Sequence, residues 1–222
     1  MSTTTREPDD QPVPTSNVAV RRLRFGPLDI EYDERVLRPR SWTARQSQWA
    51  ADLLEGAPAG PVLELCAGAG HIGLLAVLAS TRRLVSVDVD PVACDYARRN
   101  AAAAGLADRV EVRQGDLRDV LDPDERFAVV IADPPYLPST QTGRYPDDPL
   151  RAIDGGADGL DLVWPCVAAI ATHLLPGGSG VLQLRSADQA TKVADRLAAD
   201  GDLGLLEYRN QGRGVLARLG RR

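Results

Sequence analysis

A glycine-rich turn at residues 64–73, with the sequence ELCAGAGHIG, constrains the fold of this chain more than any other segment. Residues 62–66 have the composition of a buried strand, and residues 72–79 that of a helix. Glycine lets the backbone turn tightly and leaves room for a ligand to approach without meeting a side chain. This order of strand, glycine turn and helix is typical of an open α/β sheet that binds a ligand at the turn.

The rest of the chain continues the alternation of strand and helix. Asp90 is expected to cap a helix whose first residue is Pro91. An alternating order implies a mostly parallel sheet with helices on both faces, and two final strands joined by a short loop imply an antiparallel hairpin. We therefore predict a seven-stranded, Rossmann-like α/β sheet, with further strands at residues 83–88, 110–113, 127–132, 180–184, 203–208 and 215–219, helices at 90–104, 161–174 and 187–199, and one long loop at 133–158.

The segment before this sheet predicts a small extension. Two short strands, at residues 18–25 and 28–32, form a hairpin through Gly26 and Pro27, and residues 43–56 form a helix in which Thr43 and Gln46 match a capping box. Residues 1–17 are polar and contain three prolines, which predicts a disordered tail. The expected organisation is a tail at 1–17, a hairpin extension at 18–42 and one domain at 43–222.

Composition excludes several classes of protein. With 222 residues, 44% hydrophobic and 26% charged, the chain has the balance of one globular domain. No apolar run approaches the roughly 20 residues that span a bilayer, and the first residues do not form a signal peptide. Three cysteines and two histidines fit neither a disulfide framework nor a structural zinc site, so we expect no metal and a cytoplasmic location.

Charge leaves one question open. The net charge of −5 is unlike that of a general nucleic-acid binder, which usually has a strong basic excess. A local basic cluster nevertheless occurs within 25 residues near the N-terminus. It is either a solvated face or a contact for nucleic acid, and it consists of Arg21, Arg22, Arg24, Arg35, Arg38, Arg40 and Arg45.

The glycine turn is compatible with two cofactors. Gly68, Gly70 and Gly73 match the GxGxxG pattern of a dinucleotide site, and an acid that ends the next strand, Asp88, can accept both ribose hydroxyls in either case. A carboxylate at Glu64 suits an ammonium and sulfonium ligand better than a pyrophosphate. We therefore favour S-adenosylmethionine over a dinucleotide.

The third strand supplies the other end of this expected pocket. Asp116 can accept from an adenine amino group, with Leu117 as an apolar wall for the purine. The residues predicted to bind S-adenosylmethionine are Glu64, Cys66, Ala67, Gly68, Gly70, Asp88, Val89, Asp116, Leu117 and Asp133. His71, Cys166 and His173 are expected to be packing residues, as is the side chain of Cys66.

The fourth strand ends in the catalytic candidates Asp133, Pro134, Pro135 and Tyr136. The Asp133 carboxylate and the Pro134 carbonyl can each accept a hydrogen bond from one planar NH₂ group, and the two prolines hold that geometry with little entropy to lose. Tyr136 can stack on a flat amide or base. Such a site orients the nitrogen lone pair for in-line methyl transfer through positioning rather than through a strong base.

Together these segments resemble the HemK/PrmC-type protein-glutamine methyltransferases, in a short form without the family's N-terminal helical domain. The resemblance runs from about residue 25 to the C-terminus, and its most specific part is the DGGADGL stretch. It implies a class I methyltransferase fold and S-adenosylmethionine as cofactor. It rests on VLRPR at residues 36–40, ELCAGAGHIG at 64–73, VDVDP at 87–91, DPPYLP at 133–138 and AIDGGADGL at 152–160.

The resemblance implies methylation of a glutamine side-chain amide in a protein such as a translation release factor. The sequence departs from the family pattern in three places. Asp133 stands where the family usually has Asn, as in enzymes that methylate base amines, the N-terminal helical domain is missing, and Ser41 and Trp42 replace the usual proline and glutamate. The alternatives are an exocyclic amine of RNA or DNA, a small-molecule amine, and a fold that has lost its chemistry. Oligomeric state is not determined.

Overall fold

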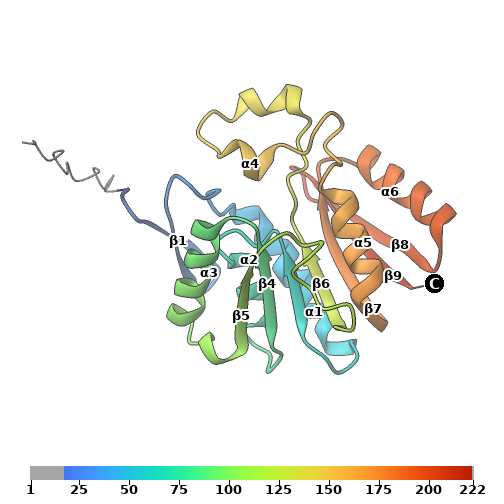
Figure 1. Cartoon of the computed structure of the whole chain (residues 1–222), viewed down its shortest axis with the longest axis horizontal. Coiled ribbons are helices and arrows are strands. Elements are labelled where there is room, and N and C mark those ends of the chain that lie inside the picture. The colour runs from blue at the N-terminus through green and yellow to red at the C-terminus, as the bar shows by residue number, and fades with distance from the viewer. Residues whose placement is uncertain (1–17, 222) are drawn as a thin grey trace, which may run out of the picture.

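In the computed structural model, which describes residues 18–221, seven strands form one twisted sheet in the order β5-β4-β3-β6-β7-β9-β8 (Figure 1). The glycine-turn strand β3 lies in the middle of the five parallel strands, and the last two strands extend the sheet as an antiparallel hairpin. The predicted fold class is therefore confirmed. The strands are β3 (Val62–Leu65), β4 (Leu84–Asp88), β5 (Val110–Gln114), β6 (Phe127–Ala132), β7 (Leu174–Leu184), β8 (Leu203–Asn210) and β9 (Val215–Arg221).

Strand β6 shows why the centre of the sheet is apolar on both faces. All six of its residues are buried. Val129 and Ile131 join one hydrophobic cluster, whereas Val130 and Ala132 join the other. A parallel strand covered by helices on both sides requires this composition, and the predicted bounds of 127–132 are those observed.

Two helical layers cover the sheet. One face carries α1 (Ala44–Gly56), α2 (His71–Val77) and α3 (Pro91–Ala103). The opposite face carries α5 (Val163–His173) and α6 (Ala187–Asp200), and Figure 1 shows both beside the β7–β9 half of the sheet. Each layer buries one hydrophobic cluster against the strands, so the carboxyl ends of β3, β4 and β6 remain open at one edge. The short η2 (Ala107–Arg109) leads into β5.

The N-terminal cap of helix α3 is the predicted one, whereas the cap predicted for α1 is absent. The Asp90 side chain accepts hydrogen bonds from the amides of Val92 and Ala93, with Pro91 as the first helical residue. At α1 the predicted capping box is wrong, because the Thr43 hydroxyl donates to the carbonyl of Arg40 at 2.8 Å. The Gln46 amide instead donates to the carbonyls of Ala132 and Val181, at 3.0 and 3.1 Å. Gln46 thus bridges the carboxyl ends of β6 and β7, where a buried amide satisfies two strand carbonyls.

Two further boundaries differ from the prediction. β7 starts at Leu174, because the Pro-Gly-Gly segment at 176–178 is accommodated as an irregularity in its pairing with β6 rather than as a turn before the strand. The predicted loop at 133–158 contains η3 (Ser139–Arg144) and α4 (Leu150–Ile153). These short turns lie above the carboxyl ends of the strands in Figure 1 and form a cover over that edge.

The predicted N-terminal hairpin is present and packs on the domain. β1 (Arg21–Phe25) pairs with β2 (Leu28–Tyr32), and Phe25 and Ile30 are buried in the same cluster as α1, α2 and α3. The hairpin is followed by η1 (Ser41–Thr43). The tail predicted at 1–17 lies outside the described residues. Within the described part of the chain, no helix is long and apolar enough to cross a membrane.

Candidate active site

The glycine turn after β3 adopts a backbone that few side chains allow. Gly68 and Gly70 have φ of +54° and +78°, and Cys66 has φ of +56° although it is not glycine. The amide of Gly70 donates to the carbonyl of Ala67 at 2.8 Å, which closes the turn. A methyl group added at Gly68 would meet no atom within 4 Å, so this glycine faces open space. The turn therefore leaves an open cradle at Gly68, where the sequence predicts the cofactor.

Asp88 at the end of β4 holds the rim of this cradle. One carboxylate oxygen accepts from the amide of Gly68 at 2.7 Å, and the other from the amide of Asp90 at 2.9 Å. Burial raises the pKa of Asp88 above its usual range, and these backbone donors partly offset that rise. The carboxylate is thus fixed in direction, with lone pairs left for ribose hydroxyls.

A cavity of about 300 Å³ opens between the glycine turn, the ends of β4 and β5 and the cover. Most of the predicted cofactor residues line it. Glu64, Gly70, Pro134 and Tyr136 are not among its lining residues. The predicted residues on its wall are Cys66, Ala67, Gly68, Asp88, Val89, Asp116, Leu117, Asp133 and Pro135.

Glu64 lies beneath the glycine turn rather than in the cavity. Its carboxylate accepts from the Gly73 amide at 2.7 Å and from the Ser86 hydroxyl at 2.9 Å. The residue is 2% exposed, and burial raises the pKa of Glu64 to about 7. Glu64 therefore braces the first turn of α2, and direct contact with a cofactor ammonium group does not follow from this position. Sequence alone placed the residue at the strand end but gave no direction for its side chain.

Asp116, after β5, lines the far end of the cavity. Its carboxylate accepts from the guanidinium and backbone amide of Arg118, and these bonds lower the pKa of Asp116 to about 2. The group is a fixed anion beside Leu117 and Gly115. Asp116 and Leu117 therefore share one wall of the cavity, and their contact with a purine stays a prediction.

The N-terminal segment supplies a wall that sequence reasoning missed. Arg35, Val36 and Leu37 line the cavity opposite the glycine turn. The only sequence signal for them is that they precede and begin the VLRPR motif. Pro149, Arg151 and Ala152 of the cover complete the enclosure.

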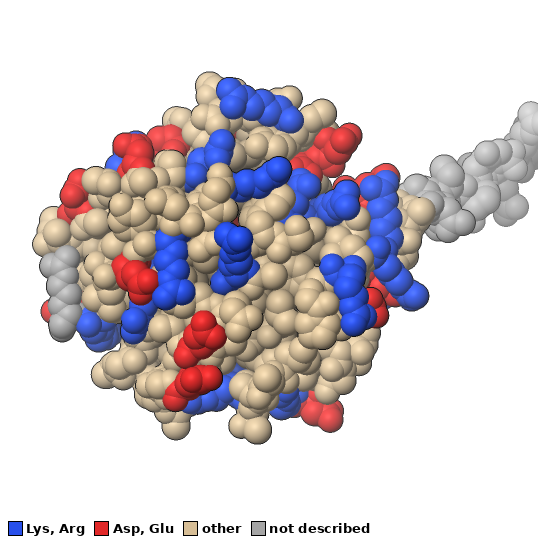
Figure 2. Space-filling model, turned by 180° about the vertical axis from the view of Figure 1, so that it is seen from behind, with Lys and Arg blue, Asp and Glu red and all other residues tan. Residues whose placement is uncertain are grey.

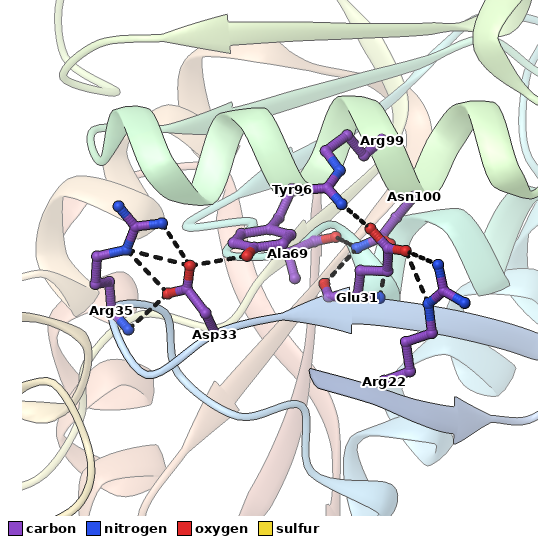
Figure 3. A network of polar contacts seen from close by, with 8 residues as sticks. All are labelled: Arg22, Glu31, Asp33, Arg35, Ala69, Tyr96, Arg99 and Asn100. Atoms are coloured by element: carbon purple, nitrogen blue, oxygen red, sulfur yellow. Dashed lines mark hydrogen bonds and ion pairs between the residues drawn. The ribbon is translucent and has the colours of Figure 1, made fainter. Parts of the chain in front are cut away.

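A polar network fixes this wall to α3 and the glycine turn (Figure 3). The Asn100 side chain accepts from the amide of Glu31 at 2.8 Å and donates to the carbonyls of Glu31 and Ala69, both at 3.0 Å. Tyr96 donates to Asp33 at 2.8 Å, and Asp33 also pairs with Arg35. The Arg35 hydrogen bonds lower the pKa of Asp33 to about 2, so the pair stays charged. The network thus anchors the hairpin and the following wall residues 35–37 to α3 and the glycine turn.

The turn after β6 carries the catalytic candidates. Asp133 is half-buried at the cavity wall, and burial raises the pKa of its carboxyl to about 7. Among residues 18–221, no donor reaches the Asp133 carboxylate or the Pro134 carbonyl. Two neighbouring acceptors are therefore free at the end of a central strand. A planar NH₂ group has the two hydrogens that this pair can accept.

Tyr136 is half-buried and follows Pro135, which lines the cavity. Burial raises the pKa of its phenol well above the usual range, while the positive charges of Arg185 and Arg40 act in the opposite direction. Its backbone carbonyl accepts from the Gln189 amide at 3.1 Å. Gln189 donates as well to the carbonyls of Asp158 and Gly159, at 3.0 and 3.2 Å. Gln189, which sequence reasoning missed, ties the turn after β6 to the DGGADGL stretch.

The DGGADGL stretch packs directly on the catalytic turn. A methyl group at Gly155 would lie 2.7 Å from the carbonyl oxygen of Pro135, and one at Gly159 would collide with the backbone of Tyr136. Leu137 pairs with the stretch as a parallel bridge to Asp154, and the amide of Gly155 donates to its carbonyl at 2.8 Å. Glycine is required at 155 and 159 because the two backbones touch. The stretch therefore supports the acceptor side of the site.

The residues expected to pack are buried. Cys166 and His173 lie inside α5, with 0% and 7% exposure. His71 lines the cavity and contacts the Phe25 ring edge-on at 4.8 Å, and burial lowers the pKa of His71 to about 3. The imidazole is therefore neutral at physiological pH. Burial and the neighbouring Cys166 thiol keep the pKa of Cys66 high, so its thiol stays protonated.

The N-terminal arginine cluster is partly neutralised by ion pairs. Arg22 pairs with Glu31, Arg24 with Asp29, Arg35 with Asp33 and Arg40 with Asp148. These pairs hold the hairpin and the cover in place. The remaining members, Arg21, Arg38 and Arg45, have no acidic partner among the described residues.

A glycine cradle between β3 and α2, an acid at the end of β4 and a DPPY turn after β6 define a class I S-adenosylmethionine-dependent methyltransferase domain. A methyltransferase-domain family model matches residues 62–144. The chain belongs, within that class, to the HemK/PrmC family of glutamine methyltransferases. It is 32% identical over 187 residues to the release factor glutamine methyltransferase of Xylella fastidiosa, an alignment that covers 82% of this chain and 67% of that protein.

Other relatives carry two kinds of name. The ribosomal protein uL3 glutamine methyltransferase of Bordetella pertussis is 36% identical over 162 residues, covering 68% of this chain and 53% of that protein. The release factor glutamine methyltransferase of Clostridium acetobutylicum is 29% identical over 187 residues, covering 81% of this chain and 65% of that protein. The chain thus spans between half and two thirds of the length of these relatives.

Solved structures agree on the fold. The hMettl16 catalytic domain, in complex with a MAT2A 3′UTR hairpin, superposes with a TM-score of 0.68 at 16% identity and covers 86% of this chain and 74% of that one. The ribosomal protein L11 methylase of Lactobacillus delbrueckii superposes with a TM-score of 0.61 at 15% identity and covers 84% and 82%. At these identities the likeness shows the α/β architecture and no more.

Proposed function

We propose that this protein transfers a methyl group from S-adenosylmethionine to the side-chain amide nitrogen of a protein glutamine. The observation that carries the proposal is the pair of free acceptors, the Asp133 carboxylate and the Pro134 carbonyl, at the end of β6. The names of the relatives support a glutamine acceptor, and a translation release factor or ribosomal protein uL3 is the substrate class that those names suggest.

The cavity residues fit the cofactor. Gly68 leaves open space at the turn, Asp88 would accept the hydroxyls of a ribose, and Asp116 with Leu117 would hold an adenine. When bound, S-adenosylmethionine supplies an activated methyl carbon on a sulfonium. Neutral His71 and the protonated Cys66 thiol add no competing charge to the wall.

The chain's own residues act by positioning. Asp133 and Pro134 accept the two amide hydrogens, which turns the nitrogen lone pair toward the methyl carbon. Tyr136 covers the plane of the amide, and Gln189 and the DGGADGL glycines hold the turn that carries all three. As the nitrogen becomes positive, the Asp133 carboxylate stabilises that charge in a site sheltered from water. No strong base is required, because the proton can leave after transfer.

A second candidate acceptor is an exocyclic amine of RNA or DNA. The observation that favours it is Asp133 itself, where the family usually has Asn, because a carboxylate adds charge to the acceptor side. The exocyclic amine of a base resembles an amidine and gains more positive charge than an amide during methyl transfer. The Asp133 carboxylate would therefore stabilise the transition state of a base amine more strongly. The same two acceptors would orient either nitrogen, so geometry at β6 does not separate them.

Transfer of labelled methyl groups separates the two candidates. Purified protein is incubated with methyl-labelled S-adenosylmethionine and a lysate of cells that lack it, and the product is divided between protease and nuclease. Label lost to protease, followed by identification of methylglutamine in the band, supports the proposal. Label lost to nuclease would show that the methyl acceptor is a base amine of a nucleic acid. Label resistant to both, or absent altogether, contradicts both macromolecular acceptors. An Asp133→Ala protein is the control for transfer at this site.

A further inference from the structure

Three arginines without a carboxylate partner lie at the carboxyl end of the sheet. Arg45, Arg185 and Arg213 have no acidic partner within residues 18–221. On the hairpin and on α3, by contrast, Arg22, Arg24, Arg35, Arg98 and Arg99 are each paired with a carboxylate. Uncompensated positive charge therefore lies at this end of the sheet, although the chain as a whole has a net charge of −5.

The three side chains lie in one region although they are far apart in sequence. Leu184 pairs with Val215, so Arg185 follows β7 at the point where the 211–214 loop enters β9. Arg45 donates to the side chain of Gln211 in that loop at 2.9 Å. The guanidinium of Arg213, from the same loop, lies 5.0 Å from the centroid of the Trp42 ring.

Two further arginines border this region. Arg40 lies 5.7 Å from the same Trp42 ring, and Arg209 lies 4.0 Å from the Trp49 ring. We call Arg40, Arg45, Arg185, Arg209 and Arg213 the arginine face. Figure 2, which shows the side of the molecule that lies behind in Figure 1, has basic side chains gathered across the middle and upper part of the surface.

The arginine face continues into the acceptor side of the active site. The backbone amide of Arg185 donates to the Gln189 side chain, which donates in turn to the Tyr136 carbonyl, and Arg40 pairs with Asp148 of the cover. The side chain of Arg185 is half-buried, and its buried Nε atom has no hydrogen-bond partner in the described residues. A bound anion at this face would therefore lie beside the entrance for the acceptor.

The chemistry of the face favours a phosphodiester chain over a protein surface. The Arg213 guanidinium stacks on Trp42 without a carboxylate partner in the described residues, so its planar donors are available to phosphate oxygens, whereas Arg40 and Arg209 also pair with Asp148 and Glu207. Protein interfaces require an apolar centre, but Trp49 is buried and Trp42 is flanked by guanidinium groups. The exposed large apolar residues of the described chain, among them Leu150 and Leu206, are not part of the arginine face.

We propose that the arginine face binds the phosphate backbone of a nucleic-acid strand next to the acceptor site. This inference goes beyond the proposed function, because it holds whether the methylated nitrogen belongs to a protein or to a base. Such a surface would recruit a glutamine acceptor that is presented together with RNA, or would hold the strand that carries an acceptor base.

Fluorescence anisotropy tests binding without any transfer reaction. The probes are labelled RNA and DNA strands of one mixed sequence, about 20 nucleotides long, which exceeds a typical single-stranded site. We expect the full-length protein to bind at about 50 mM salt and to lose affinity toward about 200 mM, with a log–log slope of about −2 for three phosphate contacts. The double variant Arg45→Gln/Arg213→Gln should bind at least about tenfold more weakly and reduce the slope by about 1.4.

The matched control removes the same charge from the opposite end of the sheet. Arg83→Gln/Arg126→Gln lies beside the first residues of β4 and β6 and should bind the strand like the wild type. Both double variants should retain the wild-type affinity for S-adenosylmethionine, because none of the four substituted arginines lines the cofactor cavity. Both should also keep the wild-type melting temperature. The RNA and DNA arms establish which strand the face prefers, and a preference for either supports the proposal.

Three results would overturn it. The proposal is wrong if the wild-type protein binds neither strand at about 50 mM salt. It is equally wrong if the control double loses as much affinity as the Arg45/Arg213 double. Competition by polyglutamate as effective as that by RNA would show that the face serves acidic protein surfaces. None of these outcomes depends on which acceptor is methylated, so a failure here is distinct from a failure of the transfer assay.

Discussion

Arg40 and Asp148, 108 residues apart in sequence, form an ion pair that joins the N-terminal segment to the cover over the cofactor cavity. The side chains are 27% and 11% exposed, so the pair is partly sheltered from solvent. Arg40 comes from the VLRPR motif, and Asp148 immediately precedes Pro149 on the cavity wall. The ion pair therefore holds the N-terminal segment and the cover together on the two sides of the cofactor cavity.

Asp148→Asn should weaken binding of S-adenosylmethionine. Loss of the ion pair frees the cover, and we expect the dissociation constant to rise by about three- to tenfold, equivalent to about 1 kcal/mol. Isothermal titration calorimetry measures it. The exposed pair of Arg24 and Asp29 gives the matched control, because Asp29→Asn removes a carboxylate far from the cavity wall and should leave affinity unchanged. Equal affinity of Asp148→Asn and wild type would contradict the closing role.

Asp133 should make methyl transfer depend on pH. Burial raises the pKa of Asp133 to about 7, so the stronger acceptor, the carboxylate, forms only as pH rises through about 7. We expect kcat of the wild type to increase over that range and the profile of Asp133→Asn to be flat. Asp133→Ala should reduce kcat by about 10²-fold or more at saturating S-adenosylmethionine, since it removes one oriented acceptor. A parallel profile for Asp133→Asn and wild type would refute the assignment.

The same pKa has a consequence for stability. A carboxyl whose pKa is raised in the folded state stabilises the fold at low pH and loses that contribution as pH rises from its ordinary value of 3.8 through about 7. Asp133→Asn should therefore raise the melting temperature at alkaline pH and change it little in acid. Thermal unfolding at both pH values checks the sign.

Glu64→Ala should destabilise the protein more than Ser86→Ala does. The first leaves the buried Gly73 amide and the Ser86 hydroxyl without their shared acceptor, at a cost of about 1 to 3 kcal/mol for each unsatisfied group. The second removes one hydrogen bond, with an effect of about 1 kcal/mol. Urea unfolding gives both values. If Glu64→Ala were the milder variant, the bracing role of Glu64 under the turn would be wrong.

Gly68→Ala should abolish cofactor binding with little loss of stability. A methyl group there meets no protein atom within 4 Å and so occupies ligand space, while the φ of +54° adds a strain of about 1 kcal/mol. Gly56→Ala is the matched control, because Gly56 ends α1 and its added methyl group also meets nothing within 4 Å. Titration of both with S-adenosylmethionine decides. If Gly68→Ala bound S-adenosylmethionine with wild-type affinity, the glycine turn would not be part of the cofactor site.

Asn100→Ala should loosen the cavity wall formed by residues 35–37. The variant loses hydrogen bonds to Glu31 and Ala69, which connect the hairpin to the glycine turn, and leaves their buried groups unpaired. We expect a lower melting temperature and a weaker affinity for S-adenosylmethionine, with faster amide exchange confined at first to the hairpin. The surface variant Arg98→Gln, on the same helix, should show none of these changes. An unchanged affinity in Asn100→Ala would separate the hairpin from the cofactor site.

Local chemistry was enough for much of the fold and part of the site. Strand β6, the Asp90 cap and the glycine turn were predicted from adjacent residues, because apolar runs, capping and positive φ are properties of short segments. The DPPY turn and Asp88 followed from the rule that parallel strands present their carboxyl ends at one edge. Most predicted cofactor residues line the cavity for this reason.

Only the tertiary structure decided where side chains from distant segments meet. Glu64 turns under the glycine turn because the Gly73 amide and the Ser86 hydroxyl need an acceptor there. Gln46 leaves its predicted capping role because two strand carbonyls are open above α1. The pairing of Arg40 with Asp148 and the three bonds of Gln189 depend on contacts across the chain, which no local pattern contains. Sequence determined the elements and their order, and packing determined the direction in which each functional group points.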